Sequence, residues 1–260
     1  MYQSVRLEMC NNTATVWLCR SEVSNAFDAL LIAELKEVFL TLSDQKDLRV
    51  VILRAEGKNF CAGADIKWMK ESAQADWAEN EKSALLLSDM FTAIAQCRHP
   101  TVAVVQGLAL GGGAGLVAAC DMAIAMKSAV FSFTEVRLGL VPAVIAPYVL
   151  RAIGAKAALR YFQTAERINA DQALRLGLVS EVADTEQNMI EVLMALVQSI
   201  KLGAPNAQYT CKKLIHDWQT QKIADLRIES AQLIAGIRSL PEAQQGLGAF
   251  FEKKQADWVE

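Results

Sequence analysis

The segment Val102–Leu116 reads VAVVQGLALGGGAGL and joins a continuous apolar run to a cluster of glycines. A short apolar run without polar alternation is typical of a strand buried on both faces, as in a parallel sheet. Each glycine weakens a helix by roughly 1 kcal/mol relative to alanine. Five glycines within Gly107–Gly115 therefore indicate either tight helix-to-sheet packing or a ligand that approaches the backbone closely, and both interpretations stay open.

The segment Val50–Ile66 follows the same plan of buried strand, glycine-containing turn and helix start. Gly63 can adopt backbone conformations closed to other residues, and Ala64 has almost no side chain, so a ligand could reach its amide. An ordinary strand-to-helix turn is the alternative. Together the two segments predict two places where amides without intrahelical partners project from the backbone.

The remaining pattern predicts an α/β fold in which most strands pair in parallel, because strands alternate with helices over the first two-thirds of the chain. Asn11 and Asn12 predict a turn, and Asp28 a helix N-cap. After Pro142 the pattern is mostly helical. The expected elements are strands at 5–9, 13–18, 49–53, 102–105, 122–125, 130–133 and 178–182, helices at 29–42 and 68–96, and a glycine-rich turn at 107–115 followed by a buried helix at 116–120.

Composition excludes several classes of function. The chain has 260 residues, of which 53% are hydrophobic, with 26 Lys and Arg against 29 Asp and Glu for a net charge of −3. Without a dense basic run it is a poor candidate for binding nucleic acid or an anionic membrane. The six cysteines form no Cys-x-x-Cys pair, and with two histidines they predict free thiols rather than a metal site.

The sequence also bears on location. The first ten residues contain no apolar core of signal-peptide length, and no apolar stretch is long enough to span a membrane. We therefore expect a cytoplasmic protein.

Two linked motifs carry a family resemblance. FCAGADI at 60–66, followed by GGG at 111–113 and ACD at 119–121, resembles the two signature segments of the crotonase (enoyl-CoA hydratase/isomerase) superfamily. The likeness extends from RSEVSNAF at 20–27 to FFEKK at 250–254. It implies a crotonase-like ββα superhelical (spiral) core that binds acyl-CoA over residues 1–200, and a C-terminal helical trimerisation region over residues 201–260.

The resemblance also implies the site. The amides of Ala64 and Gly112 would form an oxyanion hole for a thioester enolate, and Glu135 would be the catalytic acid/base. The CoA thioester is the substrate, and no cofactor is expected. Residues implied in substrate binding are Ser24, Asn25, Ala26, Ala62, Asp65, Ile66, Lys67, Gly115, Phe250 and Lys253.

The helical tail predicts a partner subunit, because large apolar surfaces mark interfaces and closed symmetric assemblies are common. With the resemblance, we expect a homotrimer or homohexamer. The apolar residues of this tail include Leu214, Ile215, Trp218, Ile223, Leu226, Leu233, Ile234, Ile237, Leu247, Phe250 and Phe251.

The sequence departs from the family pattern at Gly115, which stands where two-glutamate hydratases have their second glutamate. A single-glutamate enoyl-CoA delta isomerase is therefore an alternative. The stretch Leu138–Val149, together with Gly115 and Leu116, resembles bacterial methylglutaconyl-CoA hydratases of leucine breakdown and favours hydration.

Two other classes are more distant. One is a non-catalytic CoA-binding protein. The other is a dinucleotide-dependent oxidoreductase, because Gly113–Ala118 matches a Gly-x-Gly-x-x-Ala pattern with Glu135 about twenty residues further on.

Overall fold

The computed structural model describes residues 2–220 and 225–259, without the side chain of Leu226. The chain divides into two compact units, Met1–Met194 and Ala195–Glu260. The division falls within helix α7 (Glu186–Lys201), whereas the sequence places the boundary after residue 200. None of the helices in the described ranges is both long enough and apolar enough to cross a membrane.

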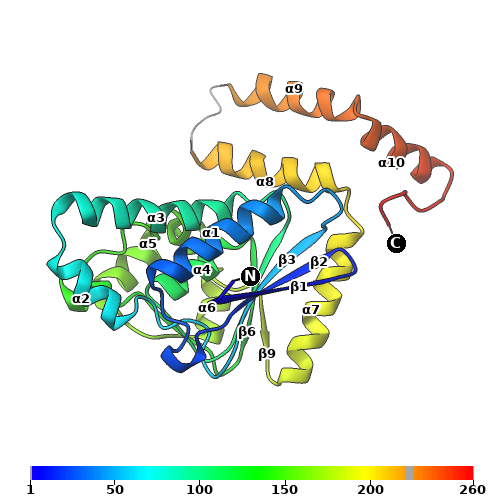
Figure 1. Cartoon of the computed structure of the whole chain (residues 1–260). Helices are drawn as coiled ribbons and strands as arrows, with labels where there is room; N and C mark the ends of the chain where they lie inside the picture. The colour runs from blue at the N-terminus through cyan, green and yellow to red at the C-terminus, as the bar shows by residue number, and fades with distance from the viewer. Residues whose placement is uncertain (1, 221–224, 260) are drawn as a thin grey trace. The chain divides into compact units, whose positions relative to one another are not determined.

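The first unit is built on a sheet in the order β1-β2-β3-β4-β6-β9 (Figure 1). Only β1 and β2 pair in antiparallel fashion in this sheet, and the other neighbours are parallel, as predicted. Asn11 and Asn12 connect the first hairpin with φ values of 45° and 58°, the left-handed conformation that a two-residue hairpin loop requires and Asn tolerates. The strands are β1 Val5–Cys10, β2 Thr13–Leu18, β3 Val50–Ala55, β4 Thr101–Val105, β6 Met122–Met126 and β9 Glu181–Ala183.

A second, smaller sheet in the order β5-β7-β8 completes the spiral. Its strands are β5 Leu108–Leu110, β7 Val130–Ser132 and β8 Ile168–Asn169. The chain passes from β4 to β5 and then into α4 (Gly112–Ala119), and likewise from β6 to β7. After β3, Cys61 joins the edge of β5 through a parallel bridge to Ala109 before α2 (Ile66–Gln74) begins. This ββα repeat confirms the predicted fold.

Helices cover the central strands. Figure 1 shows α1 (Ala29–Ser43) lying alongside α3 (Trp77–Ala95), and the two pack together. The predicted cap of α1 is confirmed, because the Asp28 carboxylate accepts from the Leu31 amide at 2.8 Å. The single helix expected over 68–96 was wrong. A capping box at Asp76 and Glu79 starts α3 as a separate helix, and the extended residue Ala75 ends α2.

The predicted turn at 107–115 was also wrong, and the buried helix predicted at 116–120 is confirmed but begins four residues earlier. Leu108–Leu110 is strand β5, because it pairs with β7, and α4 already begins at Gly112. A Cβ atom on Gly113 would lie 2.3 Å from the carbonyl oxygen of Cys61. The glycine therefore serves close packing inside the helix rather than a turn before it.

The remainder of this unit contains α5 (Ala146–Thr164), α6 (Ala170–Leu176) and β9. Helix α5 is interrupted at Gly154, whose φ of 73° is not helical. Strand β9 begins at Glu181 rather than at the predicted residue 178. The amides of Leu178 and Val179 bond to the Ala173 carbonyl, so these two residues close the end of α6 instead.

The second unit contains the end of α7, then α8 (Pro205–Gln219), α9 (Leu226–Arg238) and α10 (Pro241–Phe251). The Glu242 carboxylate accepts hydrogen bonds from the amides of Asn206 and Ala207 and so joins α10 to the start of α8. Ile223 and the Leu226 side chain, both in the predicted apolar tail, lie outside the described residues. Apolar side chains of this unit that are exposed include Ile215, Trp218, Ile234, Leu247, Phe250 and Phe251.

Gly113→Ala should destabilise the fold by about 1–3 kcal/mol, because its methyl group would press on the Cys61 backbone, which cannot swing aside as a side chain can. Gly236→Ala is the matched control, since Gly236 lies inside α9 with nothing within 4 Å of the added atom. Chemical denaturation of both variants measures the difference. Equal stability of the Gly113→Ala protein and the wild type would contradict the packing role.

Candidate active site

The Ala64 amide belongs to a short extended segment, residues 60–65, that is hydrogen-bonded to strand β5 on one side and to Phe27 on the other. Phe27 forms a parallel bridge with Ala64: its amide donates to Gly63 at 2.7 Å, and its carbonyl accepts from Asp65 at 2.8 Å. In a parallel bridge the amide of the middle residue points away from the partner. The Ala64 amide accordingly has no backbone acceptor among the residues that the structure describes.

The Gly112 amide is the first of α4, and it too has no backbone acceptor within the described ranges. It lies next to the first segment. A Cβ atom on Gly63 would be 2.9 Å from the Leu110 carbonyl oxygen and 3.8 Å from the Gly112 nitrogen. The structure thus brings the two glycine-containing turns together at one point. The positive end of the α4 dipole adds to the attraction of this point for negative charge.

Glu135 begins the 3-10 helix η2 (Glu135–Leu138) and places its carboxyl group beside the glycine turn. A Cβ atom on Gly111 would be 3.1 Å from Glu135 Oε1. The second oxygen, Oε2, is buried without a hydrogen-bond partner in the described part of the chain. Burial raises the pKa of Glu135. A buried carboxyl group that the fold leaves unsatisfied, beside two unpaired amides, is typical of a catalytic acid/base.

Position 115 is occupied by apolar packing. A Cβ atom on Gly115 would lie 2.3 Å from Ile145 Cγ2 and 3.2 Å from Phe91 Cε1. The Ile145 side chain therefore fills the space into which a side chain at position 115 would point. No carboxylate fits there without displacing Ile145, so the site has the carboxyl group of Glu135 beside Gly111 and none at position 115.

The thiol in the first motif is not a nucleophile. Cys61 is fully buried, and burial raises the pKa of its thiol to about 12. A thiol is reactive as a thiolate, and this one stays protonated at neutral pH. Chemistry at the junction therefore falls to Glu135 and the backbone amides.

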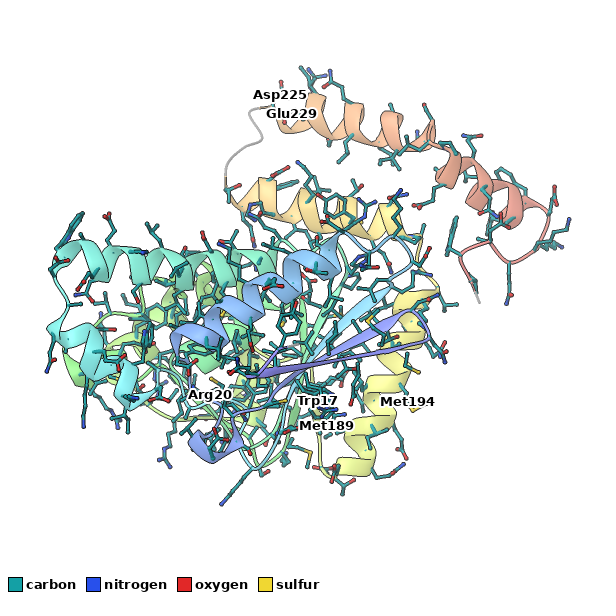
Figure 2. All side chains as sticks on the ribbon, in the orientation of Figure 1. Trp17, Arg20, Met189, Met194, Asp225 and Glu229 are labelled. Carbon is teal, nitrogen blue, oxygen red and sulfur yellow. The ribbon has the colours of Figure 1, made fainter. Side chains whose placement is uncertain are left out.

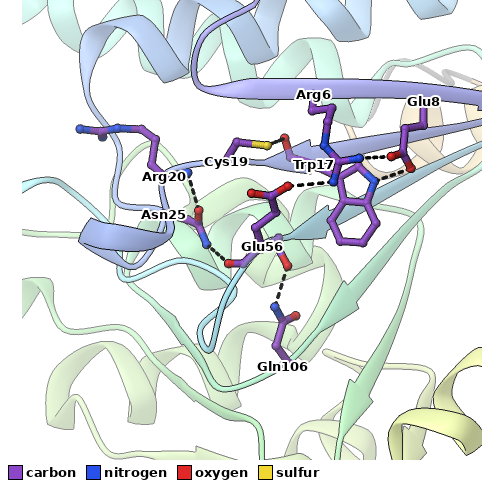
Figure 3. Close-up of polar contacts among 9 residues, drawn as sticks. Arg6, Glu8, Trp17, Cys19, Arg20, Asn25, Glu56 and Gln106 are labelled. Atoms are coloured by element: carbon purple, nitrogen blue, oxygen red, sulfur yellow. Dashed lines mark hydrogen bonds and ion pairs between the residues drawn. The ribbon is translucent and has the colours of Figure 1, made fainter.

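The loop of Ser24, Asn25 and Ala26, which is predicted to bind substrate, is held by the side chain of Asn25. Its side chain is completely buried, accepts from the Arg20 amide at 2.8 Å and donates to the carbonyls of Glu56 and Asn59 at 2.9 Å (Figure 3). All of its polar atoms are thus committed to the loop. Ala26 is buried, and the Ser24 hydroxyl accepts from the Asn59 side chain at 3.0 Å.

The other predicted binding residues lie in two places. Ala62 and Asp65 are half-buried next to Gly63, while Ile66 and Lys67 are exposed in the first turn of α2. Asp65 caps that helix by accepting from the Lys67 amide at 2.8 Å, and this bond together with the guanidinium of Arg20 holds the pKa of Asp65 below its usual value.

Phe250 and Lys253 belong to the second unit, where both are exposed.

Two residues that shape the site were not among those predicted from the sequence. Phe27 carries the bridge to Ala64, and a Cβ atom on Gly112 would lie 2.4 Å from its ring atom Cε2. Arg20, which lies two residues after the end of β2 (Figure 2), forms ion pairs with Asp28 and Asp65. Both belong to the stretch 20–27 that carries the resemblance, but only contacts between distant segments reveal these roles.

The dinucleotide interpretation does not fit this geometry. The residues Gly113–Ala118 lie inside α4, whereas a dinucleotide fingerprint needs its glycines in the turn between a strand and a helix.

Comparison with known proteins identifies the family. Residues 8–260 match the family model for enoyl-CoA hydratase/isomerase. A short-chain-enoyl-CoA hydratase from Clostridium acetobutylicum is 30% identical over 98% of this chain and 97% of its own. A crotonyl-CoA hydratase from Syntrophomonas wolfei is 29% identical over 99% and 98%. The crystal structure of an enoyl-CoA hydratase from Shewanella pealeana superimposes with a TM-score of 0.94 at 35% identity, covering 98% of this chain and 96% of that one. The chain is a member of the enoyl-CoA hydratase/isomerase family, within the crotonase superfamily.

Proposed function

We propose that this enzyme adds water to a 2-enoyl-CoA thioester. The observation that carries the proposal is the buried, unpartnered carboxyl oxygen of Glu135 beside the turn that presents the Gly112 amide. Reactions at the carbons next to a thioester pass through an enolate, which needs a positioned acid/base and fixed donors for its oxygen. Both kinds of group meet at this junction.

The proposed chemistry uses one carboxylate for both proton transfers. The thioester oxygen accepts from the amides of Ala64 and Gly112. Glu135, in its ionised form, takes a proton from water as the water oxygen bonds to the β-carbon, and the double-bond electrons move to the thioester oxygen. Glu135 then returns the proton to the α-carbon, and the enolate collapses to a 3-hydroxyacyl-CoA. The addition is neither an oxidation nor a reduction, so the proposal requires no cofactor.

A delta isomerase is the second candidate, because the same single carboxylate favours it. Glu135 would remove a proton from the α-carbon of a 3-enoyl-CoA and deliver it to the γ-carbon. The packing of Ile145 against Gly115 leaves no room for a second carboxylate at position 115 to activate water. The hydratases among the relatives support hydration over this alternative.

The acyl group that we favour is methylglutaconyl, from leucine breakdown. The proposal rests on the likeness of the stretch Leu138–Val149, which includes Ile145, the residue against Gly115. Two relatives named as crotonyl-CoA and short-chain-enoyl-CoA hydratases support a short acyl chain. Turnover of a panel of enoyl-CoA thioesters, with methylglutaconyl-CoA among them, would identify the acyl group.

We also propose that the chain assembles as a trimer or a dimer of trimers and that CoA lies along the first motif. The exposure of Ile66 and Lys67 supports the CoA contact. The exposed apolar side chains of the second unit, with Phe250 and Phe251 each about three-quarters exposed, support the assembly. Phe250 and Lys253 would contact CoA from there.

Glu135→Gln should lower turnover by at least about 100-fold, because it removes the acid/base while keeping the shape of the side chain. The same variant should be more stable than the wild type at pH 8. The raised pKa of Glu135 means that the folded state opposes its ionisation. The resulting loss of stability is absent below the unfolded pKa of about 4.3, grows as the pH rises from there to the folded pKa, and is complete above it. Steady-state rates and melting temperatures at pH 4 and pH 8 check both effects. A variant that retains wild-type turnover would contradict the assignment.

Reaction in deuterated water distinguishes the two candidates. With a 2-enoyl-CoA we expect a 3-hydroxyacyl-CoA that carries one deuterium on the α-carbon, detected by mass spectrometry. With a 3-enoyl-CoA we expect little conversion. Migration of the double bond without any 3-hydroxyacyl product would favour the isomerase and overturn the hydratase.

A carboxylate can be restored at position 115 only if Ile145 is shortened. Gly115→Glu alone should destabilise the protein by about 1–3 kcal/mol through overpacking. Gly115→Glu combined with Ile145→Ala should recover part of the lost stability, because the contact with Cγ2 is removed while Cβ of residue 145 stays 2.9 Å from the added atom. The double variant should raise hydration by about 10-fold or more, because a second acid/base is then available. Gly115→Gln with Ile145→Ala is the control. Equal rates for the two double variants would show that the added carboxylate takes no part.

A further inference from the structure

The guanidinium of Arg20 contacts three groups on the two segments that meet at Ala64: the carboxylates of Asp28 and Asp65 and the carbonyl of Ala26. Its Nη2 atom lies 2.9 Å from Asp28 Oδ2 and 3.0 Å from Asp65 Oδ2. Its Nη1 atom donates to the carbonyl of Ala26. The side chains of Arg20 and Asp65 are only 17% and 13% exposed. Ion pairs shielded from water in this way are worth more than exposed ones, which contribute at most about 1 kcal/mol.

The two carboxylates occupy matching places in the sequence. Asp28 directly follows Phe27, and Asp65 directly follows Ala64. Phe27 and Ala64 are the residues paired in the parallel bridge. Arg20 therefore ties the two strands together at the next residue along each of them. A slip of one strand relative to the other would separate the two carboxylates from the shared guanidinium.

Phe27 also contacts the segment that carries the second amide, that of Gly112. Its backbone bonds to both neighbours of Ala64, and its ring fills the space that a Cβ atom on Gly112 would need. The ring is buried and meets Phe91 edge to face at 6.3 Å. One residue thus contacts both amide-bearing segments, and a shift of Phe27 would change the separation of the two donors.

The fold does not need Arg20 to hold the carboxylates in place. The Asp28 carboxylate caps α1 through the Leu31 amide, and the Asp65 carboxylate caps α2 through the Lys67 amide, each at 2.8 Å. Each cap stabilises its helix by typically about 1 kcal/mol. Because the caps remain when Arg20 is replaced, the guanidinium contributes chiefly to the register between the two segments.

We propose that Arg20 is a positioning residue for the oxyanion hole: through Asp28, Asp65 and the Phe27 bridge it aligns the amide of Ala64 with that of Gly112, without touching the thioester. This inference rests on the proposed function, in which both amides stabilise the enolate. A misplaced donor weakens the transition state more than the bound substrate. The expected signature is therefore a fall in kcat rather than a rise in KM.

The test compares Arg20→Met, Arg20→Lys and, as a control, Arg160→Met, which breaks an exposed ion pair with Glu166. Arg20→Met should lower kcat by about 10- to 100-fold, less than the loss of a whole donor, with KM within about threefold of the wild type. Arg20→Lys should recover part of the rate, because an ammonium keeps the charge but lacks the planar fork. Arg160→Met should leave both constants unchanged.

A second measurement follows the amide itself in the free protein. In protein labelled with ¹⁵N-alanine, Arg20→Met should shift the amide resonance of Ala64, identified by its loss in Ala64→Gly, and Arg160→Met should not. An unmoved resonance, an unchanged kcat, or a rise in KM alone would each overturn the positioning role, and the last would indicate CoA binding instead. If the wild type hydrates no enoyl-CoA, the proposed function fails, and the Ala64 resonance then decides whether Arg20 positions this amide.

Discussion

The backbone of residues 60–65 is hydrogen-bonded along both edges, and the geometry of the active site depends on this constraint. Along one edge Cys61 exchanges hydrogen bonds with strand β5, and along the other the residues around Ala64 bond to Phe27. A segment held on both edges cannot change register without leaving buried groups unpaired, at about 1–3 kcal/mol for each group. The Ala64 amide, which donates to neither neighbour in the described part of the chain, is therefore presented in a fixed direction.

Close packing at Gly63 and Gly112 and the burial of Glu135 both shape the active site. An added Cβ atom at Gly63 would collide with the carbonyl oxygen of Leu110, so backbone meets backbone there, and one at Gly112 would collide with the ring of Phe27. Such close approach leaves the amides of the turn accessible. It also surrounds the nearby carboxyl group of Glu135 with protein rather than water, and the resulting desolvation raises its pKa. The packing that positions the amides of Ala64 and Gly112 thus also raises the pKa of the proposed acid/base.

The same packing restricts the chemistry. Ile145 lies against the helix face at Gly115, next to the aromatic pair of Phe91 and Tyr148. Apolar contacts occupy the space that a second carboxylate would need, so proton transfer in the proposed mechanism depends on one group. Under this proposal, water must be activated by the carboxylate that also protonates the α-carbon, and its pKa has to serve both steps.

The sequence by itself determined the alternation of strands and helices, the Asn11–Asn12 hairpin and the Asp28 cap, because hydrophobic period, turn residues and capping are local properties. Through the resemblance it also pointed to Ala64, Gly112 and Glu135. Only the tertiary structure decided that α4 begins at Gly112, that Leu108–Leu110 is a strand, and that Phe27 and Arg20 shape the site. Each of these depends on a hydrogen bond, an ion pair or a packing contact between segments far apart in the chain. The local sequence pattern does not identify such distant partners, because a glycine that leaves room for a distant carbonyl cannot be distinguished in the sequence from one that makes a turn.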